Sequence, residues 1–507
     1  MSAVLILAGC SSSGGTSATP QSGGTFTIAV ASDIRNYDTS NCVPTVYCAV
    51  AYDTLTHLSP ADGSIQPGLA TKWEWADDAH TRFRLTLRDG ATFSDGTPVD
   101  AAAVVASFTS FLTAPGPFAA TSYPLTGAEA GPDGTVDILF AEPVTDYFAA
   151  YNLSGQSSVG WIISPSASAD RSVMENATAG GGPYTLDSAN SVKGVQYTFV
   201  PNPDYYEKDS VKYDKVVIKV VADPAARLNA VRSGEVNWAS NIASTDLETA
   251  ESAGLTVSRG RVGSFAALAL QARSSGPLAD ERVRQALSYA TNRDDIATAL
   301  YGDATPTSSF IPEGAEGYDA SLTDAYGYDQ DKARSLLAEA GYADGLTITV
   351  FDPSFFDPGG ALGQALKAAY AEVGVTLNLE TFDGSAGDVA VRSGQYDAFI
   401  LTSGGNGVTQ AIYTMLRPNG GLANPQNVPL DDDLVAKLHT AATAPSADQE
   451  KLAQDVTARL DELMYVVPIA AISSLQAVSA DVKNVPDQFW SIEANPFSPV
   501  PDEAWEG

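Results

Sequence analysis

The chain has 507 residues, 44% of them hydrophobic, and 61 acidic against 28 basic residues, which gives a formal net charge of −33. A single hydrophobic core rarely serves so long a chain, so two or three domains are expected. The charge argues against nucleic acid as a partner, because phosphates would be repelled, and no apolar run approaches the roughly 20 residues of a membrane-spanning helix. Because the acidic residues are spread along the chain, they indicate a solvated surface rather than an acidic ligand site.

The first residues end in Leu7-Ala8-Gly9-Cys10, which has the form of a lipobox, a site where an exported protein is lipidated on cysteine. Residues 11–23, rich in Ser and Gly, are typical of a flexible tether behind such an anchor. A signal peptide normally has a basic n-region and a longer apolar stretch, so residues 1–10 are interpreted as a truncated signal segment. The alternative is that Leu7-Ala8-Gly9-Cys10 has the form of a lipobox by chance. The pattern predicts lipidation of Cys10 and export to the outer face of the cytoplasmic membrane, at the cell surface or in the periplasm.

Two further cysteines, Cys42 and Cys48, lie close together in the sequence. An exported protein meets an oxidising compartment, in which neighbouring cysteines can pair. We therefore predict a local disulfide between them, with two buried free thiols as the alternative.

The stretch from Pro67 to Phe108 predicts two strands, a turn and a helix. Residues 82–88 alternate in strand fashion, with apolar side chains on one face and arginines on the other. Asp100 is placed to cap the helix that follows. The charges of this stretch are interpreted as solvated strand and turn residues.

Elsewhere strands and helices alternate, which indicates parallel or mixed sheets of the α/β class. The segments predicted as strands are 24–30, 136–140, 197–200, 216–221, 346–350, 375–379, 396–401 and 466–469. The segments predicted as helices are 146–153, 225–232, 277–290, 329–341, 361–374, 388–392 and 453–465.

No pattern of catalytic residues stands out in the chain. The three histidines, His57, His80 and His439, are scattered, and no zinc-protease, serine-hydrolase or phosphate-loop motif occurs. His57 and His80 are therefore expected on the surface, and neither a metal nor another cofactor is expected. Two acids at a suitable separation would suffice for a glycosidase, so a secreted hydrolase of this type is the alternative function. An adhesion lipoprotein is less supported, because internal repeats are absent.

Several motifs, in one order along the chain, carry a resemblance to a known family. They are PGLATKW and FRLTLRDGATFSDGTPVDA within 67–108, GGGPY at 180–184, NPDYY at 202–206, SGEVN at 233–237 and PLADERVRQALSYA at 277–290. Together they resemble the signature of the family 5 extracellular solute-binding proteins, the peptide-, dipeptide- and nickel-binding receptors of ABC importers.

The resemblance implies an α/β, two-lobed periplasmic-binding-protein-like fold with mixed sheets, a central cleft and an extra inserted domain. Lobe I would comprise residues 24–55, 179–266 and 473–507, domain II residues 56–178, and lobe III residues 267–472. The implied function is capture of a peptide or other small polar solute between lobes that close by hinge motion. A monomeric binding protein that docks on ABC permease subunits is expected, rather than an enzyme.

The resemblance also implies where the solute lies. In lobe I the wall of the cleft would be the loop after the first strand, and where the chain passes to lobe III a second segment would contact the solute. In lobe III the wall of the cleft would be the loop 402–407. In peptide-binding relatives this loop carries an aromatic residue and an Asp that pairs with the α-ammonium of the peptide. Ser403 and Asn406 stand near those two positions, which weakens the assignment to peptides. Two aromatic residues, Trp161 and Tyr413, are equally consistent with core or pocket. The candidate ligand-binding residues are Val43, Pro44, Thr45, Tyr47, Trp161, Ser264, Phe265, Ser403, Gly404, Asn406 and Tyr413.

Overall fold

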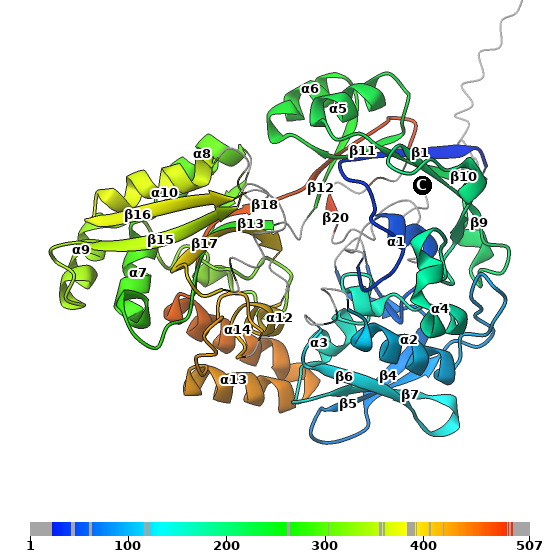
Figure 1. Cartoon of the computed structure of the whole chain (residues 1–507), viewed down its shortest axis with the longest axis horizontal. Helices are drawn as coiled ribbons and strands as arrows, with labels where there is room; N and C mark the ends of the chain where they lie inside the picture. Colours follow the sequence, from blue (N-terminus) through cyan, green and yellow to red (C-terminus); the bar gives the residue numbers. More distant parts are fainter. Residues whose placement is uncertain are drawn as a thin grey trace, which may run out of the picture.

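The structure is a computed structural model in which the chain forms two large sheets, one smaller sheet and a short hairpin (Figure 1). Lobe III occupies the left half of Figure 1, lobe I the upper right and domain II the lower right. The structure describes residues 23–41, 46–59, 63–115, 119, 122–260, 264–302, 304–353, 357, 360–382, 391, 393–404, 407–418, 420–483, 485 and 488–489.

Lobe I is built on an eight-stranded sheet in the order β20-β12-β19-β11-β1-β10-β9-β8. Strand β1 is parallel to both β10 and β11, and helix α5 (Pro224–Arg232) connects these two, which confirms the predicted β-α-β crossover. The strands are β1 (Thr25–Val30), β8 (Tyr184–Leu186), β9 (Gln196–Pro201), β10 (Lys215–Val220), β11 (Trp238–Ile242), β12 (Thr256–Gly260), β19 (Leu475–Val478) and β20 (Gln488–Phe489). Helices α1 (Val46–Ala51) and α6 (Leu247–Ser252) complete the lobe.

Lobe III is built on a six-stranded sheet in the order β14-β18-β13-β17-β15-β16. Apolar side chains of α10, such as Leu362 and Tyr370, pack with those of β13, such as Leu268, in one buried core. The strands are β13 (Ser264–Leu270), β14 (Thr305–Pro306), β15 (Leu346–Pro353), β16 (Val375–Phe382), β17 (Ala398–Gly404) and β18 (Val466–Ile472). The helices are α7 (Glu281–Tyr289), α8 (Arg293–Tyr301), α9 (Gln330–Glu339), α10 (Ala361–Ala371), α12 (Val408–Met415), α13 (Asp432–Thr443) and α14 (Ser446–Leu463). The helix expected at 388–392 lies largely outside the described residues.

Domain II contains a four-stranded antiparallel sheet in the order β4-β5-β7-β6. Its helix α2 begins as expected, because the Asp100 side chain accepts a hydrogen bond of 2.9 Å from the amide of Ala103. The strands are β4 (Ala70–Trp75), β5 (Arg82–Leu87), β6 (Leu125–Ala130) and β7 (Val136–Phe140), with the hairpin β2 (Thr56–Leu58) and β3 (Ile65–Pro67) beside them. The helices are α2 (Ala101–Thr113), α3 (Asp146–Tyr151) and α4 (Pro165–Ala169).

The arginines of β5 are not simply solvated, as the sequence suggested. Arg84 donates two hydrogen bonds to Asp137 of β7, from Nε at 2.7 Å and from Nη2 at 2.8 Å. Asp137 is only 2% exposed, and the hydrogen bonds from Arg84 hold the pKa of its carboxyl below its usual range. The charged face of the strand therefore carries a specific cross-strand ion pair.

Domain II and lobe III share one apolar core, to which Leu55 of lobe I also belongs. Phe148 of α3 packs against Tyr413 of α12, with ring centroids 5.5 Å apart. Neither of the two core clusters of lobe I contains a described residue from 267–472. Domain II also contributes Trp161 to a core of lobe I. Domain II is thus packed against both lobes.

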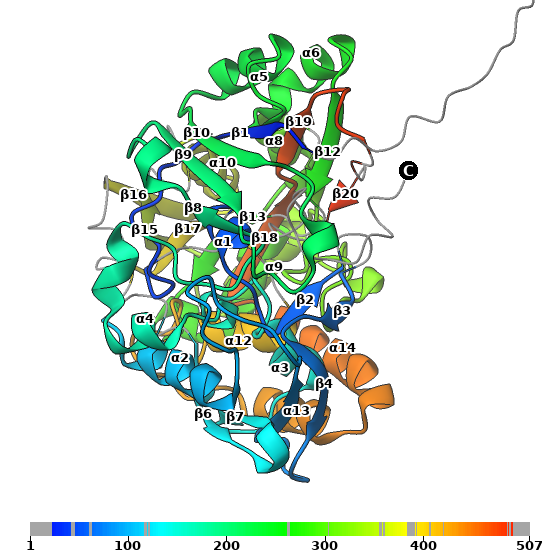
Figure 2. The ribbon, with the colours of Figure 1, turned by 90° about the vertical axis from the view of Figure 1, so that its right-hand side faces the viewer.

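The chain crosses between the two large sheets twice, from β12 to β13 and from β18 to β19. The crossings lie side by side, because β12 pairs with β19 and β13 pairs with β18 (Figure 2). The expected boundary at residue 266 falls inside β13, so the first crossing lies a few residues earlier, between Gly260 and Ser264. The three sheets support the division into lobe I, domain II and lobe III, which we keep as a proposal.

Candidate functional site

The carboxyl ends of the parallel strands in lobe I point toward lobe III. Strands β11 and β12 are both antiparallel to β19, so they are parallel to each other and to β1 and β10. The carboxyl end of β12 leads directly across to β13. The carboxyl ends of β1, β10 and β11 therefore lie at this same edge.

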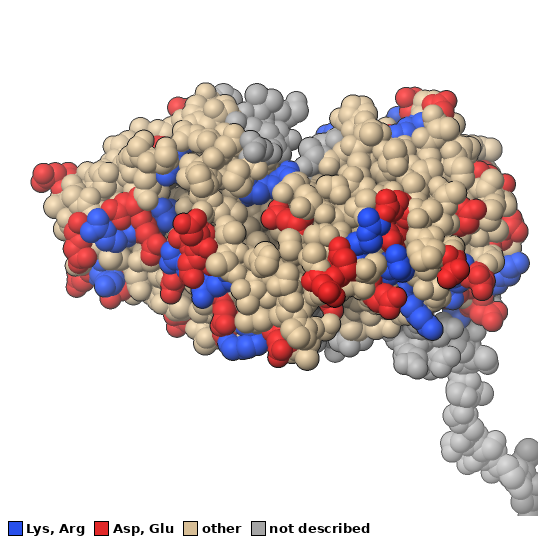
Figure 3. Space-filling model, turned by 90° about the horizontal axis from the view of Figure 1, so that it is seen from below, with Lys and Arg blue, Asp and Glu red and all other residues tan. Residues whose placement is uncertain are grey.

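The matching edge of lobe III faces back toward lobe I. Strand β13 begins at Ser264, which pairs with Gly404, the last residue of β17. Strands β15 and β16 run parallel to each other, and β15 is also parallel to β17, so all three end at this edge. Ligands of α/β sheets bind outside the carboxyl ends of the strands. The candidate site accordingly lies between the two facing edges. Seen from below, a shallow indentation separates the half of the molecule that holds lobe III from the half that holds domain II (Figure 3).

Four predicted site residues meet at the lobe III edge. Ser264 is opposite Gly404 and Phe265 is opposite Ser403 in the register of β13 and β17. The Phe265 side chain is only 1% exposed and packs against Phe310 with ring centroids 5.2 Å apart, which favours a packing role. Other predicted residues, Val43, Pro44, Thr45 and Asn406, lie outside the described residues.

Tyr47 lies in helix α1 rather than in a loop along the cleft wall. It is 3% exposed, and its ring meets that of Tyr197 edge-on at 5.4 Å. Its hydroxyl donates a hydrogen bond to the carbonyl of Ser32, in the loop after β1. This placement favours a role in fixing that loop.

Cys48, the neighbour of Tyr47 in the helix, is disulfide-bonded. Cys42 and Cys10 lie outside the described residues, so the pairing of Cys42 with Cys48 stays a prediction.

The two aromatic residues that sequence left undecided are both buried. Trp161 and Tyr413 are each 4% exposed. Tyr413 packs edge-on against Tyr123 at 5.7 Å as well as against Phe148, and Trp161 meets Tyr52 at 6.5 Å. The indole Nε1 of Trp161 has no hydrogen-bond partner among the described residues. Core packing is the role that these contacts support.

The expectation that His57 and His80 are surface residues is wrong for His57 and incomplete for His80. His57 is 3% exposed, with Nε2 2.8 Å from a carboxylate oxygen of Asp53. His80 stacks on Trp75 at 4.7 Å, and its Nδ1 lies 2.5 Å from the carbonyl oxygen of Ala442, across the contact with lobe III. Both histidines serve packing and hydrogen bonding, because folding brings partners to them that their sequence neighbours do not reveal.

One buried carboxylate at the lobe III edge was not expected from the sequence. Asp352, near the carboxyl end of β15, is 1% exposed, and neither of its oxygens has a hydrogen-bond partner among the described residues. Burial, with a smaller effect of the Asp357 charge, raises the pKa of Asp352 to about 6. Asp357 itself accepts a hydrogen bond of 2.9 Å from the amide of Gly363 in α10. No motif in the sequence marks such an unpaired group.

The described residues contain no group of three or more His, Cys, Asp or Glu side chains arranged to hold a metal ion. None of the helices within the described ranges combines the length and apolar character needed to cross a membrane.

A sequence model of the bacterial extracellular solute-binding proteins, family 5 (middle), matches residues 64–423. The chain belongs to this family. The match spans all of the four-stranded sheet, strands β8 to β12 of lobe I, the first crossing and most of lobe III, whereas β1 and the loop after it precede the match.

Relatives in this family differ widely in what their names say they bind. A probable D,D-dipeptide-binding periplasmic protein of Escherichia coli (strain K12) is 27% identical, over 74% of this chain and 72% of its own length. Heme-binding protein A of Haemophilus influenzae is 26% identical, over 74% of this chain and 72% of its own length. A periplasmic binding protein from A. tumefaciens R10, solved in complex with agropinic acid, has a TM-score of 0.77 at 24% identity, over 94% of this chain and 97% of that one. The last likeness shows the fold alone.

Proposed function

We propose that the chain is the lipid-anchored solute-binding receptor of an ABC importer. It captures a peptide or other small polar solute between lobes I and III and delivers it to a permease. The observation that carries the proposal is the pair of facing carboxyl edges, joined by two paired crossings, in a member of the solute-binding family. Capture, rather than chemistry, is the function that this geometry supports.

The two crossings supply the hinge of the proposed mechanism. The two core clusters of lobe I contain no described residue of lobe III, so the apolar contact that opening has to break is the packing of lobe III against domain II. A solute that contacts both edges favours the closed arrangement, because it binds the closed form better than the open one. The closed form then docks on the permease.

The identity of the solute does not follow from the relatives. Their names range from a dipeptide to heme, and Asn406 supplies no negative charge where peptide-binding relatives use an Asp. An ammonium buried without a carboxylate partner is poorly compensated. Peptide is therefore one candidate among small polar solutes.

The test is to identify the solute that the protein retains. The protein is purified from cells grown in rich medium and denatured, and the released molecules are analysed by mass spectrometry. A defined solute in near-stoichiometric amount supports the proposal. A protein that retains nothing, binds no member of a peptide, opine, sugar and amine panel, and instead hydrolyses chromogenic glycosides would refute it in favour of the hydrolase.

A further inference from the structure

A cavity of about 160 Å³ opens in lobe I, lined by residues that include Ile34, Arg35, Tyr37, Leu186, Lys193 and Tyr197. It lies at the carboxyl edge of the sheet. The amide of Val220, at the end of β10, donates a hydrogen bond of 2.9 Å to the carbonyl of Val195, which places the turn before β9 beside this edge. The loop 31–41 continues directly from the carboxyl end of β1. The cavity therefore belongs to the wall that lobe I turns toward lobe III.

Arg35 is the distinctive residue of this cavity. Every other arginine within the described ranges makes a hydrogen bond, an ion pair or a ring contact, for example Arg84 with Asp137 or Arg459 with Asp431. Arg35 makes none, and its side chain is exposed. In a chain with a net charge of −33, an arginine that makes none of these contacts is unusual. Its planar guanidinium is suited to hold a carboxylate with two parallel hydrogen bonds.

The acidic residue nearest in sequence is held by another partner. Asp33 accepts a hydrogen bond of 2.6 Å from the hydroxyl of Tyr197, which in turn accepts one of 3.1 Å from the amide of Gly194. Asp33 makes no ion pair with Arg35. Lys193, from the turn before β9, adds a second positive charge to the cavity wall, and Glu175 adds one negative charge, so the charged residues of the lining are positive on balance.

The lining of the cavity is mixed: Ile34, Tyr37 and Leu186 supply apolar surface, and Asn36, Asn176, Ser188 and Ser191 add polar groups. Tyr37 is 3% exposed, and its ring meets those of Tyr197 and Phe199 edge-on at 6.4 and 6.3 Å. Its hydroxyl has no hydrogen-bond partner among the described residues, and burial raises the pKa of the phenol, so it keeps its proton. Ile34 and Leu186 add aliphatic surface. The volume is well below that of a complete small-molecule site, so the cavity is sized for one end of a solute.

We propose that this cavity binds a carboxylate-bearing end of the transported solute, with Arg35 holding the carboxylate and the surface of Ile34, Tyr37 and Leu186 contacting the apolar carbons next to it. The inference rests on the proposed function, because it takes the solute to lie between the lobes. It assigns the solute to the organic acids, whether the acid is the carboxyl terminus of a peptide or the acid group of another metabolite.

The test uses 4-fluorobenzoate as probe and its neutral isostere 4-fluorobenzamide as reference, with binding measured by ¹⁹F NMR on the full-length protein. Arg35→Gln removes the proposed contact, and Arg232→Gln, at the exposed end of α5 in the same lobe, is the matched control. We expect the wild type and R232Q to bind the benzoate equally and the amide at least tenfold more weakly. R35Q should bind the benzoate at least tenfold more weakly than the wild type, and Lys193→Gln should lie between them. Failure of the wild type to bind the benzoate, or equal affinity in R35Q, overturns the proposal.

The retained solute separates this proposal from the proposed function. Mass spectrometry of solute released from wild type, R232Q and R35Q should find an acid that is depleted in R35Q alone, and its fragmentation distinguishes a peptide from another organic acid. A solute without a carboxylate, retained equally by all three, overturns the carboxylate assignment and leaves the receptor function intact. If none of the three retains a solute, the solute panel and the glycoside assay decide the proposed function, and the benzoate titration decides the cavity.

Discussion

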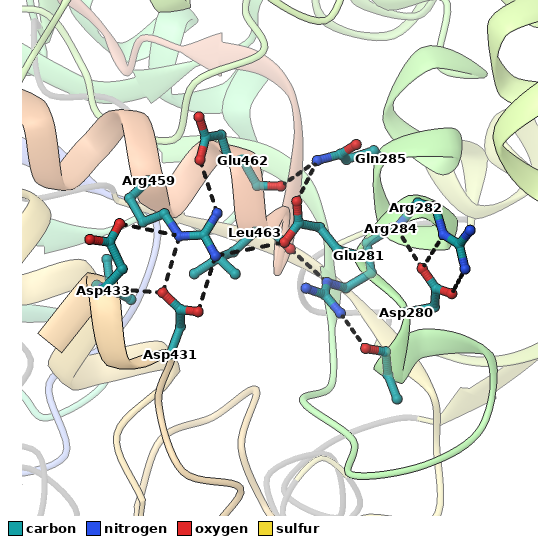
Figure 4. Close-up of polar contacts among 12 residues, drawn as sticks. Asp280, Glu281, Arg282, Arg284, Gln285, Asp431, Asp433, Arg459, Glu462 and Leu463 are labelled. Carbon is teal, nitrogen blue, oxygen red and sulfur yellow. Dashed lines mark hydrogen bonds and ion pairs between the residues drawn. The ribbon is translucent and has the colours of Figure 1, made fainter. Parts of the chain in front are cut away.

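Arg459 of α14 binds Asp431 through two hydrogen bonds of 3.0 Å, one from Nε and one from Nη2 (Figure 4). Asp431 is also the residue that begins α13, because its carboxylate accepts a hydrogen bond of 3.0 Å from the amide of Leu434. Glu462 receives a third bond from the same guanidinium, 2.9 Å long. One side chain thus fixes the start of one helix against the end of another.

Replacing Arg459 with Met should lower the free energy of unfolding by about 1–3 kcal/mol, because charge-assisted hydrogen bonds to a helix cap are lost. Urea denaturation measures this. Arg334→Met is the control, because Arg334 is 45% exposed and pairs with Asp331, which is 99% exposed, so its loss should cost less than about 0.5 kcal/mol. Equal effects of the two changes would contradict the account.

Glu316 makes the contact between domain II and lobe III sensitive to pH. It is 3% exposed, accepts hydrogen bonds from the Thr145 hydroxyl and from the amide of Thr409, and burial raises its pKa to about 7. A raised carboxyl pKa means that the folded state binds the proton more tightly, so the contribution to stability is complete below about pH 4 and is lost as pH rises through 7. The thermal midpoint should therefore fall between about pH 5 and 8.

Glu316→Gln removes the titrating proton while keeping the shape of the side chain. The thermal midpoint of the variant should fall less steeply over the same pH range. At the alkaline end, the free energy of unfolding of the variant should exceed that of the wild type by up to about 3 kcal/mol. An unchanged pH profile would show that other groups, such as the buried Asp461, dominate.

Asp352 and Asp137 offer a direct comparison of buried carboxylates without and with a partner. Asp352→Asn should raise the free energy of unfolding by about 2 kcal/mol at pH 7.5, where the native protein holds an unpaired charge, and by about half as much at pH 5, which lies between the ordinary and the raised pKa. Asp137→Asn should instead lower it at both pH values, because Arg84 loses its partner. Denaturant titrations of both variants at the two pH values are the measurement, and a loss of stability in D352N at pH 7.5 would count against the assignment of an unpaired charge.

Lipidation of Cys10 is testable without structural information. Cys10→Ala should move the protein from the membrane fraction to the soluble fraction, because the thiol that carries the lipid is gone. Immunoblots of fractionated cells measure this, and Cys48→Ala serves as a cysteine control that stays with the membrane. A C10A variant that still sediments with membranes would exclude the lipoprotein assignment.

Local patterns predicted the elements of this fold well, because they depend on neighbours in sequence. The cap at Asp100 and the β-α-β unit around α5 are set by spacing and propensity. The family resemblance, which rests on the order of the motifs, also predicted Ser264, Phe265, Ser403 and Gly404 as residues of one site. The register of β13 and β17 places them side by side.

Properties that depend on distant partners did not follow from the sequence. The residues around His57 predict a strand, but the burial of the His57 side chain beside Asp53 is set by the surrounding domain. Tyr47 was assigned to a loop, although α1 begins one residue before it. Neither the unpartnered Asp352 nor the unengaged Arg35 has a motif, because what marks them is the absence of a neighbour in space.

The apolar core that domain II shares with lobe III bears on how long a solute stays bound. Opening wide enough to separate Phe148 from Tyr413 would expose apolar surface, at roughly 25 cal/mol for each Å². The resting population is therefore weighted toward a narrow mouth, which increases the fraction of molecules ready to bind and so reduces the affinity lost to conformational change. The same restriction slows escape. Under the proposed function, residence time, more than capture rate, is then the quantity that docking on a permease has to change.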